Sequence, residues 1–402
     1  MIKSKFQIIP LENLAAKEKS AIKIGPFGSQ LKKSELVSSG IHIIGIENVI
    51  NENFDGLGDR FITNAKFQTL KSVAVKPGDI LITMMGTIGE LAVVPEGTST
   101  SIMDSHLLRF RPNTALCDRK YISWAIKCSS AVKQSLDKNA RGAIMSGLNS
   151  EIIRSLPIPL PPLTEQKRIA AILDKADDIR RKRLQAIQLV EEFLKSIFLD
   201  MFGDPVTNPK GFKIKRLDNV LDYITSGSRG WARYYSDSGA KFLRIQNVGR
   251  NEILLTDLAH VNAPKGAEAE RTRVKSGDIL LSITADLGRT GVIYQDIGEA
   301  YINQHLAILR VSSAEPIYIS AFLASKGGQL QIKKLDRQGV KSGLNFDDIR
   351  SLEILDAPAE LQRKFAAIWK KVQKHKVRLI EFSLLTDLNF RALSSSAFRG
   401  DL

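Results

Sequence analysis

The sequence contains two copies of one unit, and this duplication limits the possible folds more than any other feature. The stretch KPGDILITMMGTIGELAVV, which begins at Lys76, matches KSGDILLSITADLGRTGVI, which begins at Lys275, at an offset of 199 residues. The same offset pairs GIENV with RIQNV and SHLLRFR with QHLAILR, whereas SGLNSEIIRSL and SGLNFDDIRSL are 196 residues apart. Matches in one order at nearly constant offset predict one structural unit that occurs twice, with small differences in its loops.

Each copy ends in a long helical pattern. The first follows the two prolines of PPLTEQKRIAAIL, and Thr164 is the expected N-cap. Gly203 is expected to end this helix, so some 39 residues at 1.5 Å each predict a rod of roughly 58 Å. Apolar residues in both copies alternate at spacings of three and four, which is typical of a coiled-coil seam. Arg183 interrupts the pattern in the first copy and His375 in the second. The expected seam positions are Ile169, Ile172, Ala176, Ile179, Ala186, Val190, Phe193 and Ile197 in the first helix, and Leu361, Phe365, Ile368, Val372, Leu379 and Phe382 in the second.

The globular part of each copy mixes strand and helix patterns. GDILIT and GDILLS each predict a turn that leads into a strand, and ISWAIKCSSAVKQSL has helical spacing. Strands and helices without regular βαβ alternation favour the α+β class. We therefore expect globular domains at 1–160 and 209–356, a central helix within 161–208 and a C-terminal helix within 357–402. Because neither helix can bury its apolar stripe alone, we expect the two to pair antiparallel, with the two domains related by a pseudo-twofold axis.

Composition indicates the kind of partner. The 402 residues carry a net charge of +15, which favours a polyanionic partner, although solubility alone is an alternative reason for such a charge. Two cysteines are too few for a disulfide framework or a closed zinc site. The sequence has no apolar run of membrane-spanning length and no signal-peptide core, so we expect a soluble, reduced, cytoplasmic protein.

Signatures of catalysis are missing from the sequence. It contains no GxxxxGK[ST] phosphate loop, no HExxH, no GxGxxG fingerprint that follows a strand, and no Asn/Asp-Pro-Pro-aromatic motif of a DNA amino-methyltransferase. We also find no clustered carboxylates and lysine of the common endonuclease type. The chain is therefore predicted to be non-catalytic and to hold no cofactor or metal of its own.

With these motifs in view, the sequence resembles the specificity subunit of type I restriction–modification enzymes over essentially its whole length. Two divergent copies, each closing with SGLN, IRSL and then a PPLTEQKRIAAIL-type helix, carry the resemblance. The second copy departs from it at Ala357-Pro358-Ala359-Glu360-Leu361-Gln362, where the proline pair and the Glu-Gln step are degraded.

The resemblance implies a division of labour. Each globular part would be a target recognition domain that reads one half of a bipartite, asymmetric site in double-stranded DNA. The helices would set the length of the unread spacer and dock two methyltransferase subunits, which carry S-adenosylmethionine. Restriction subunits, which use ATP and Mg²⁺, would join that core. The alternative from another functional class is a coiled-coil scaffold that links two protein-binding domains.

Candidate DNA contacts lie in loops that differ between the copies or combine glycine with basic residues. The alternative for each loop is an ordinary surface turn, with Trp231, Tyr234 and Tyr235 as core aromatics. Glycine lets the main chain approach a phosphate, and arginine can bind phosphates or guanine edges. The candidates are Ser29, Gln30, Lys32, Lys33, Met85, Thr87, Arg141, Ser228, Arg229, Arg233, Tyr234, Asp286, Arg289, Arg337 and Lys341.

Two recurring histidines and a basic run on the first long helix have both a structural and a functional interpretation. His106 and His305 recur at one position, but without an evident carboxylate or cysteine partner they are expected to be structural. The basic run from Arg180 to Arg183 is expected to be a solvated helix face, with phosphate contact as the alternative. Residues assigned to the spacer and docking helices are Gln166, Ile169, Ile172, Ile179, Val190, Phe193, Phe365, Ile368, Val372 and Leu379.

Overall fold

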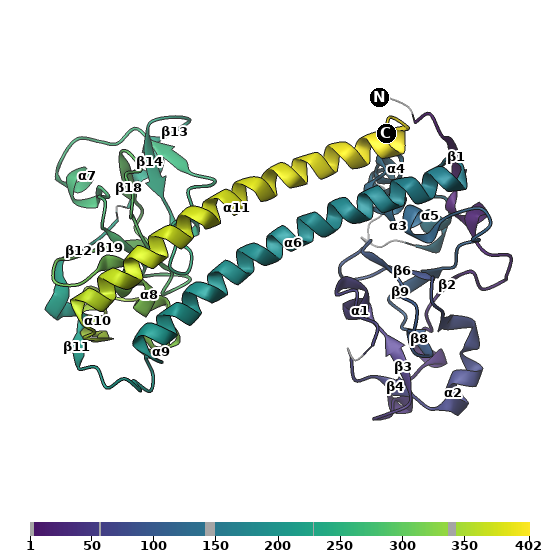
Figure 1. Ribbon diagram of the computed structural model, residues 1–402, viewed down its shortest axis with the longest axis horizontal. Coiled ribbons are helices and arrows are strands. Elements are labelled where there is room, and N and C mark those ends of the chain that lie inside the picture. Colours follow the sequence, from purple (N-terminus) through teal and green to yellow (C-terminus); the bar gives the residue numbers. More distant parts are fainter. Residues whose placement is uncertain (1–3, 56–57, 141–148, 228, 337–342) are drawn as a thin grey trace. The chain divides into compact units, whose positions relative to one another are not determined.

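The computed structural model describes residues 4–55, 58–140, 149–227, 229–336 and 343–402. The chain divides into two compact units. Unit 1 comprises Met1–Arg183 and Phe382–Leu402, and unit 2 comprises Leu184–Glu381. Each unit contains one globular part and portions of both long helices, α6 (Leu163–Phe202) and α11 (Ala359–Arg399) (Figure 1).

The globular part of unit 1 contains three sheets. Their orders are β2-β9-β6-β7, β4-β3-β8-β5 and β1-β10. The strands are β1 (Gln7–Pro10), β2 (Ile22–Ile24), β3 (Ile41–Ile44), β4 (Phe61–Ile62), β5 (Ala74–Val75), β6 (Ile80–Thr83), β7 (Leu91–Val93), β8 (Ser101–Met103), β9 (Leu107–Phe110) and β10 (Pro157–Leu160). The helices are α1 (Ile46–Ile50), α2 (Asn64–Thr69), α3 (Arg119–Cys128), α4 (Ser130–Ala140) and α5 (Ser150–Arg154).

Unit 2 repeats this arrangement. Its sheets have the orders β12-β19-β16-β17, β13-β15-β14-β18 and β11-β20. The strands are β11 (Ile214–Arg216), β12 (Leu221–Ser226), β13 (Tyr235–Ser236), β14 (Ala240–Leu243), β15 (Ala259–Val261), β16 (Ile279–Ser282), β17 (Thr290–Val292), β18 (Ala300–Ile302), β19 (Leu306–Val311) and β20 (Glu353–Leu355). The helices are α7 (Ala267–Thr272), α8 (Pro316–Ala324), α9 (Lys326–Leu335) and α10 (Phe346–Ser351). In both units a parallel pair, β3 with β8 or β14 with β18, lies among antiparallel neighbours.

The GDIL motif forms a strand that is covered on both faces. In β6, Ile80 and Ile82 lie in the core that also contains α3 and the start of α6, whereas Leu81 faces the core of the second sheet. Alternate side chains of a strand point to opposite faces, so a strand between two cores is apolar at every position. β16 repeats the pattern, with Leu280 in one core and its neighbours in another.

The long helices are anchored in the globular parts by aromatic side chains. In unit 2, Phe198, Phe202 and Phe365 pack with Tyr318 at ring-centroid distances of 4.6 to 6.1 Å. In unit 1, Tyr121 packs against Phe398 at 5.6 Å. Aromatic pairs of this kind contribute about 0.5–1.5 kcal/mol each beyond their buried area. The ends of both helices are therefore part of the domain cores.

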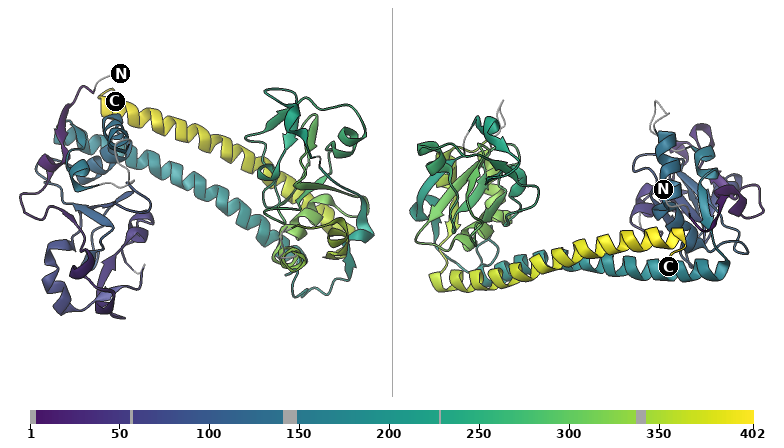
Figure 2. Two further views of the ribbon diagram at one scale, coloured as in Figure 1. Left: turned by 180° about the vertical axis from the view of Figure 1, so that it is seen from behind. Right: turned by 90° about the horizontal axis from the view of Figure 1, so that it is seen from above.

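Within each unit the two long helices run antiparallel and side by side (Figure 2). In unit 1, Arg183 donates hydrogen bonds to the Phe382 carbonyl and the Thr386 hydroxyl, and Arg180 lies 3.9 Å from Asp387. In unit 2, Lys376 bonds Glu191 at 2.7 Å. The predicted α+β class and the packed pair of long helices are confirmed, whereas the four-segment division of the chain stays a prediction.

Two details of the helix prediction are wrong. The helix begins at Leu163, before the expected cap Thr164, because the Pro162 carbonyl already accepts the N–H groups of Glu165 and Gln166 at 2.9 and 3.0 Å. The expected end is correct, since α6 stops at Phe202 before Gly203, whose φ is +77°.

The expected seam is only partly correct. Ile169 and Phe365 are buried, whereas Ile179 and Phe193 are 42% and 54% exposed. Other buried positions of α6 lie one residue after expected ones, namely Leu173, Asp177, Leu194 and Phe198. In α11, Phe382 is 55% exposed. Apolar residues lie on more than one face of each helix, and the domain cores decide which face is buried. The expected seam residues therefore contribute partly to the surface.

Candidate nucleic-acid interface

The candidate loops of unit 1 leave the main sheet at one end. Thr83, at the end of β6, pairs with Leu107, at the start of β9, and Ile24, at the end of β2, pairs with Leu108. Antiparallel neighbours in this register bring three connections together, namely the chain after Gly25, residues 84–90 and residues 104–106. Two backbone hydrogen bonds tie them, from Gly25 N–H to Leu107 at 3.0 Å and from Met84 N–H to His106 at 2.8 Å. We call this the loop end of the sheet.

Unit 2 has the same loop end. Ser282 pairs with Leu306, and Ser226 pairs with Ala307, so the chain after Gly227 and the connections 283–289 and 303–305 meet there. A bridge between Thr284 and Gly343 also brings in the chain just before α10. Loops that differ in sequence therefore occupy equivalent places on one scaffold.

The candidates of unit 1 are exposed. Ser29 and Gln30 lie in a 3₁₀ turn, Gly28–Gln30, and Lys32 and Lys33 follow directly. Met85 is 50% exposed in the β6–β7 connection. The exposed candidates of this unit are Ser29, Gln30, Lys32, Lys33, Met85 and Thr87. Arg141 lies outside the described residues.

The candidates of unit 2 are less uniform. Arg229 and Arg233 are exposed, and the Arg233 guanidinium lies 4.9 Å from the Tyr234 ring centroid. The Arg289 guanidinium lies 2.6 Å from the Asp286 carboxylate within the β16–β17 connection. Its positive charge therefore already has an acidic partner in the same loop. Ser228, Arg337 and Lys341 lie outside the described residues. The expected alternative for the aromatics holds for Trp231, which is buried and stacked on Phe242.

The repeated motifs themselves form the scaffold, a role that sequence reasoning did not assign to them. The buried side chain of Asn48 accepts the Gly45 N–H at 2.8 Å, and that of Asn247 accepts the Arg244 N–H at 3.0 Å. Each asparagine also donates to carbonyls of the loop that follows it. The recurrence of Asn-Val in both copies was the signal that could have identified these loop locks.

The aspartate of GDIL has an equally structural role. Asp79 accepts the Lys76 N–H at 2.8 Å and pairs with Arg111 at 2.6 Å, and Asp278 repeats both contacts with Lys275 and Arg310. Unit 1 adds the buried Arg109, whose pKa is lowered to about 10, chiefly because burial disfavours its charge. These ion pairs fasten the turn to the neighbouring strand, so Asp79 and Asp278 have a structural role.

The recurring histidines have different partners. His106 Nδ1 lies 3.5 Å from Asp104 Oδ2, so the expectation that no carboxylate is near is wrong for this copy. The two side chains lie close together because the Asp104 carboxylate also accepts the backbone N–H of His106 at 2.9 Å. His305 instead contacts the Thr284 hydroxyl at 2.5 Å and the Gln304 amide. Because the two histidines have different partners, they do not form a catalytic site that is repeated in both units.

A glutamine attaches each long helix to its globular part. The buried Gln166 accepts the Asp118 N–H at 2.8 Å and donates to the carbonyls of Pro161 and Leu116 at 2.9 and 3.2 Å. Gln362 likewise accepts the Glu315 N–H at 2.9 Å and donates to Ala357 at 2.8 Å. Of the predicted docking residues, Gln166, Ile169 and Phe365 are at most 1% exposed and offer no surface to a partner.

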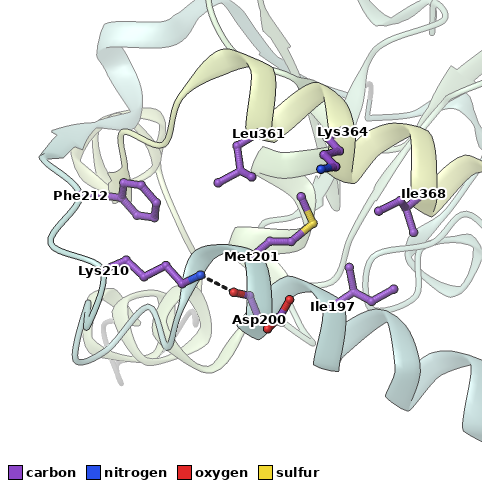
Figure 3. Close-up of a pocket in the computed structure, with 8 residues that line it drawn as sticks. All are labelled: Ile197, Asp200, Met201, Lys210, Phe212, Leu361, Lys364 and Ile368. Atoms are coloured by element: carbon purple, nitrogen blue, oxygen red, sulfur yellow. Dashed lines mark hydrogen bonds between the residues drawn. The ribbon is translucent and has the colours of Figure 1, made fainter.

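An opening lies on unit 2 beside the helix pair. It measures about 520 Å³ and is lined mainly by apolar residues of α6, α11 and the chain between α6 and β11 (Figure 3). Lys210 bonds the Asp200 carbonyl at its rim. The lining residues are Ile197, Asp200, Met201, Lys210, Phe212, Leu361, Lys364 and Ile368. It is a groove along the helices, far in sequence from the loop end.

Neither a metal centre nor a membrane span is found in the described part of the chain. Its His, Cys, Asp and Glu side chains form no group of three able to hold a metal ion. Within the same residues, no helix combines the length and apolarity needed to cross a bilayer.

The chain is similar to known specificity subunits of type I restriction enzymes. Residues 27–189 match the type I restriction modification DNA specificity domain. The MjaVIII type I restriction enzyme specificity subunit of Methanocaldococcus jannaschii is 25% identical over 270 residues, which is 61% of each chain. The EcoBI specificity subunit of Escherichia coli is 20% identical over 93% of this chain and 83% of its own.

A solved structure supports the fold over the whole length. The type I restriction–modification S subunit from M. genitalium aligns with 99% of this chain and 98% of its own, with a TM-score of 0.58 and 12% identity. The duplicated scaffold, the paired long helices and the family match agree with the resemblance seen in the sequence. Over residues 27–189 the chain is similar to the type I restriction modification DNA specificity domain, and its fold is similar to that of a solved S subunit over nearly the whole length.

Proposed function

We propose that this chain is the non-catalytic, DNA-reading subunit of a type I restriction–modification complex. Each unit reads one half of a bipartite, asymmetric site in double-stranded DNA. The observation that carries this function is the repetition of one scaffold with different loops at its loop end. Identical locks at Asn48 and Asn247 hold loops of different sequence, which suits two readers of two different half-sites.

The charge of the chain supports DNA as the partner. A net charge of +15 and exposed basic side chains at the loops favour contact with phosphates. The exposed candidates Lys32, Lys33, Arg229 and Arg233 would bind phosphates or base edges. Arg289 is preset by Asp286, so its guanidinium would present a fixed direction to the DNA. DNA as the partner also implies a cytoplasmic location.

The long helices would dock the methyltransferase subunits. Soluble proteins seldom leave many large apolar side chains exposed on one element without a partner. Here α6 and α11 each do so, and the predicted docking residues Ile179 and Phe193 are among them. The exposed set is Ile179, Leu184, Leu189, Phe193 and Leu199 on α6, with Val377, Ile380, Phe382, Leu384, Leu385 and Leu388 on α11.

Two methyltransferase subunits would bring S-adenosylmethionine, and restriction subunits would bring ATP and Mg²⁺. The groups that would transfer a methyl group or cut DNA belong to these partners. This chain would position the DNA for them.

A domain exchange tests the proposal. Residues 1–160 are replaced by the equivalent part of a relative, and the methyltransferase complex is assembled on the hybrid. Methylated sites are then mapped across a genome. We expect one half-site to change and the other to stay the same. If both half-sites change together, the two-reader model is wrong.

A gel shift in the presence of the methyltransferase subunit separates this function from the protein-binding scaffold. The DNA reader shifts a duplex that contains its site at lower protein concentration than a duplex with one half-site scrambled. A scaffold shifts neither duplex.

A further inference from the structure

A buried lysine joins both long helices to the globular part of unit 2. Lys376 lies on α11 and is 5% exposed. Its ammonium group donates to Glu191 of α6 at 2.7 Å and to Glu252 at 2.5 Å. Glu252 belongs to the loop that follows the Asn247-Val248 lock. One side chain therefore holds three separate segments.

The ammonium stays charged in this position. Burial by itself lowers the pKa of Lys376, but the hydrogen bonds that its ammonium donates to Glu191 and Glu252, together with their negative charges, outweigh burial and raise this pKa above its ordinary value. A buried ammonium with two charged hydrogen-bond acceptors restricts the positions of the segments that it joins more tightly than an exposed ion pair does.

The contact continues from Glu252 to the candidate reading loop. The Glu252 N–H donates to the Thr290 carbonyl at 3.1 Å, and the Thr290 N–H donates to Gly249 at 3.0 Å. A Cβ atom at Gly291 would lie 2.4 Å from the Glu252 carbonyl oxygen, so the loop is pressed against β17. Thr290 directly follows Arg289 at the end of the β16–β17 connection. A short chain of hydrogen bonds thus leads from α11 to a loop that carries two candidate DNA contacts.

Unit 1 contains a weaker version of the same contact. Glu52 follows the Asn48-Val49 lock as Glu252 follows its own, and Arg181 of α6 binds Glu52 at 2.8 Å. In each unit the basic residue lies on the long helix that begins there, 18 residues after the start of α6 and 17 after the start of α11. The Arg181 side chain is 56% exposed, against 6% for Lys376. Water and salt therefore screen this pair more strongly.

We propose that Lys376–Glu252 and Arg181–Glu52 are braces, positioning contacts that hold each reading domain in one orientation on its long helix. Through them the protein discriminates the correct gap between half-sites from gaps one base pair longer or shorter. This inference rests on the proposed function and adds the residues that set the precision of the gap. The aromatic anchors hold the ends of the helices in the domain cores, and the braces add a second contact farther along each helix.

The test uses the complete methyltransferase complex and duplexes whose half-sites are separated by the correct gap or by one base pair more or less. The variant Lys376→Met keeps the length of the side chain and removes its charge. We expect the ratio of methylation rates between correct and altered gaps to fall about tenfold, which corresponds to about 1.4 kcal/mol. Lys376→Arg should restore the ratio, because arginine can bond both glutamates.

The matched control is Lys374→Met, which removes an exposed lysine two residues away on the same helix. It should leave the ratio unchanged. Thermal unfolding of each complex confirms equal folding, since general destabilisation lowers all rates without altering their ratio. An unchanged ratio in folded Lys376→Met overturns the brace.

Should Lys376→Met fail to fold, Arg181→Met carries the test, because this side chain is largely exposed. The expected loss of gap discrimination is then smaller, about threefold, and equal discrimination in this variant and the wild type overturns the proposal. A wild-type complex that methylates no bipartite site refutes the proposed function itself, an outcome distinct from either result for the braces.

Discussion

Inserting one heptad into each long helix should lengthen the unread gap of the DNA site. The insertions duplicate residues 184–190 of α6 and 375–381 of α11. They fall where the chain divides between Arg183 and Leu184 and between Glu381 and Phe382, so the contacts within each compact unit are preserved. A heptad also keeps the inward face of each helix inward, because the pattern repeats every seven residues.

The size of the effect follows from helix geometry. α6 has 40 residues, so it is about 60 Å long, and seven more add about 10 Å. DNA rises about 3.4 Å per base pair, so length alone allows up to about three more base pairs. Three base pairs also rotate DNA by about 100°, whereas a heptad turns a helix by only about 20°. We therefore expect a gap longer by about one or two base pairs.

The assay is a genome-wide map of methylated sites for the complex that carries both insertions. The half-site sequences should be unchanged, because the loop ends are untouched. A control inserts a heptad in α6 only, which mismatches the helix pair and should lower activity at every site. An active double insertion with an unaltered gap would refute the role of the helices as a ruler and leave them as a docking surface.

Three further outcomes are expected. Gln166→Leu removes three buried hydrogen bonds and should lower the free energy of unfolding of unit 1 in urea by about 3 kcal/mol. The control Gln188→Leu on the exposed face should change it by less than about 0.5 kcal/mol. Equal effects would refute the role of Gln166 in attaching the helix. Arg109→Ile copies Ile308 of the other unit but removes the Arg109 hydrogen bonds to the carbonyls of Ala74, Ser20 and Ser72. We expect the free energy of unfolding in urea to fall by about 2–4 kcal/mol, and no loss would mean that the core adapts. DNA affinity of the methyltransferase complex should fall by about 10³-fold or more between 50 and 200 mM salt if six or more phosphates are bound. Fluorescence anisotropy measures this affinity, and a flat response would count against DNA as the partner.

The duplication and the long helices could be predicted from the order of residues alone. The duplication predicted two similar units, and the spacing of apolar residues after PPLTEQ predicted a helix of nearly the observed length. Both signals are local or repetitive, and each can be seen without knowledge of contacts. The class of function also followed, because motifs in order along a chain identify a family even when its loops have diverged.

Which faces are buried and which motifs form the scaffold depends on tertiary packing. α6 has apolar residues on several faces, and only the cores that cover Leu173 and Phe198 determine that Phe193 is exposed. Repetition drew attention to Asn48 and Asp79, yet both are scaffold, because a shared framework recurs while the loops it supports diverge. The contact of Lys376 with Glu252 joins residues 124 apart in the sequence, and no periodicity encodes it. Such contacts depend on how separate elements meet, which the linear pattern of one sequence does not specify.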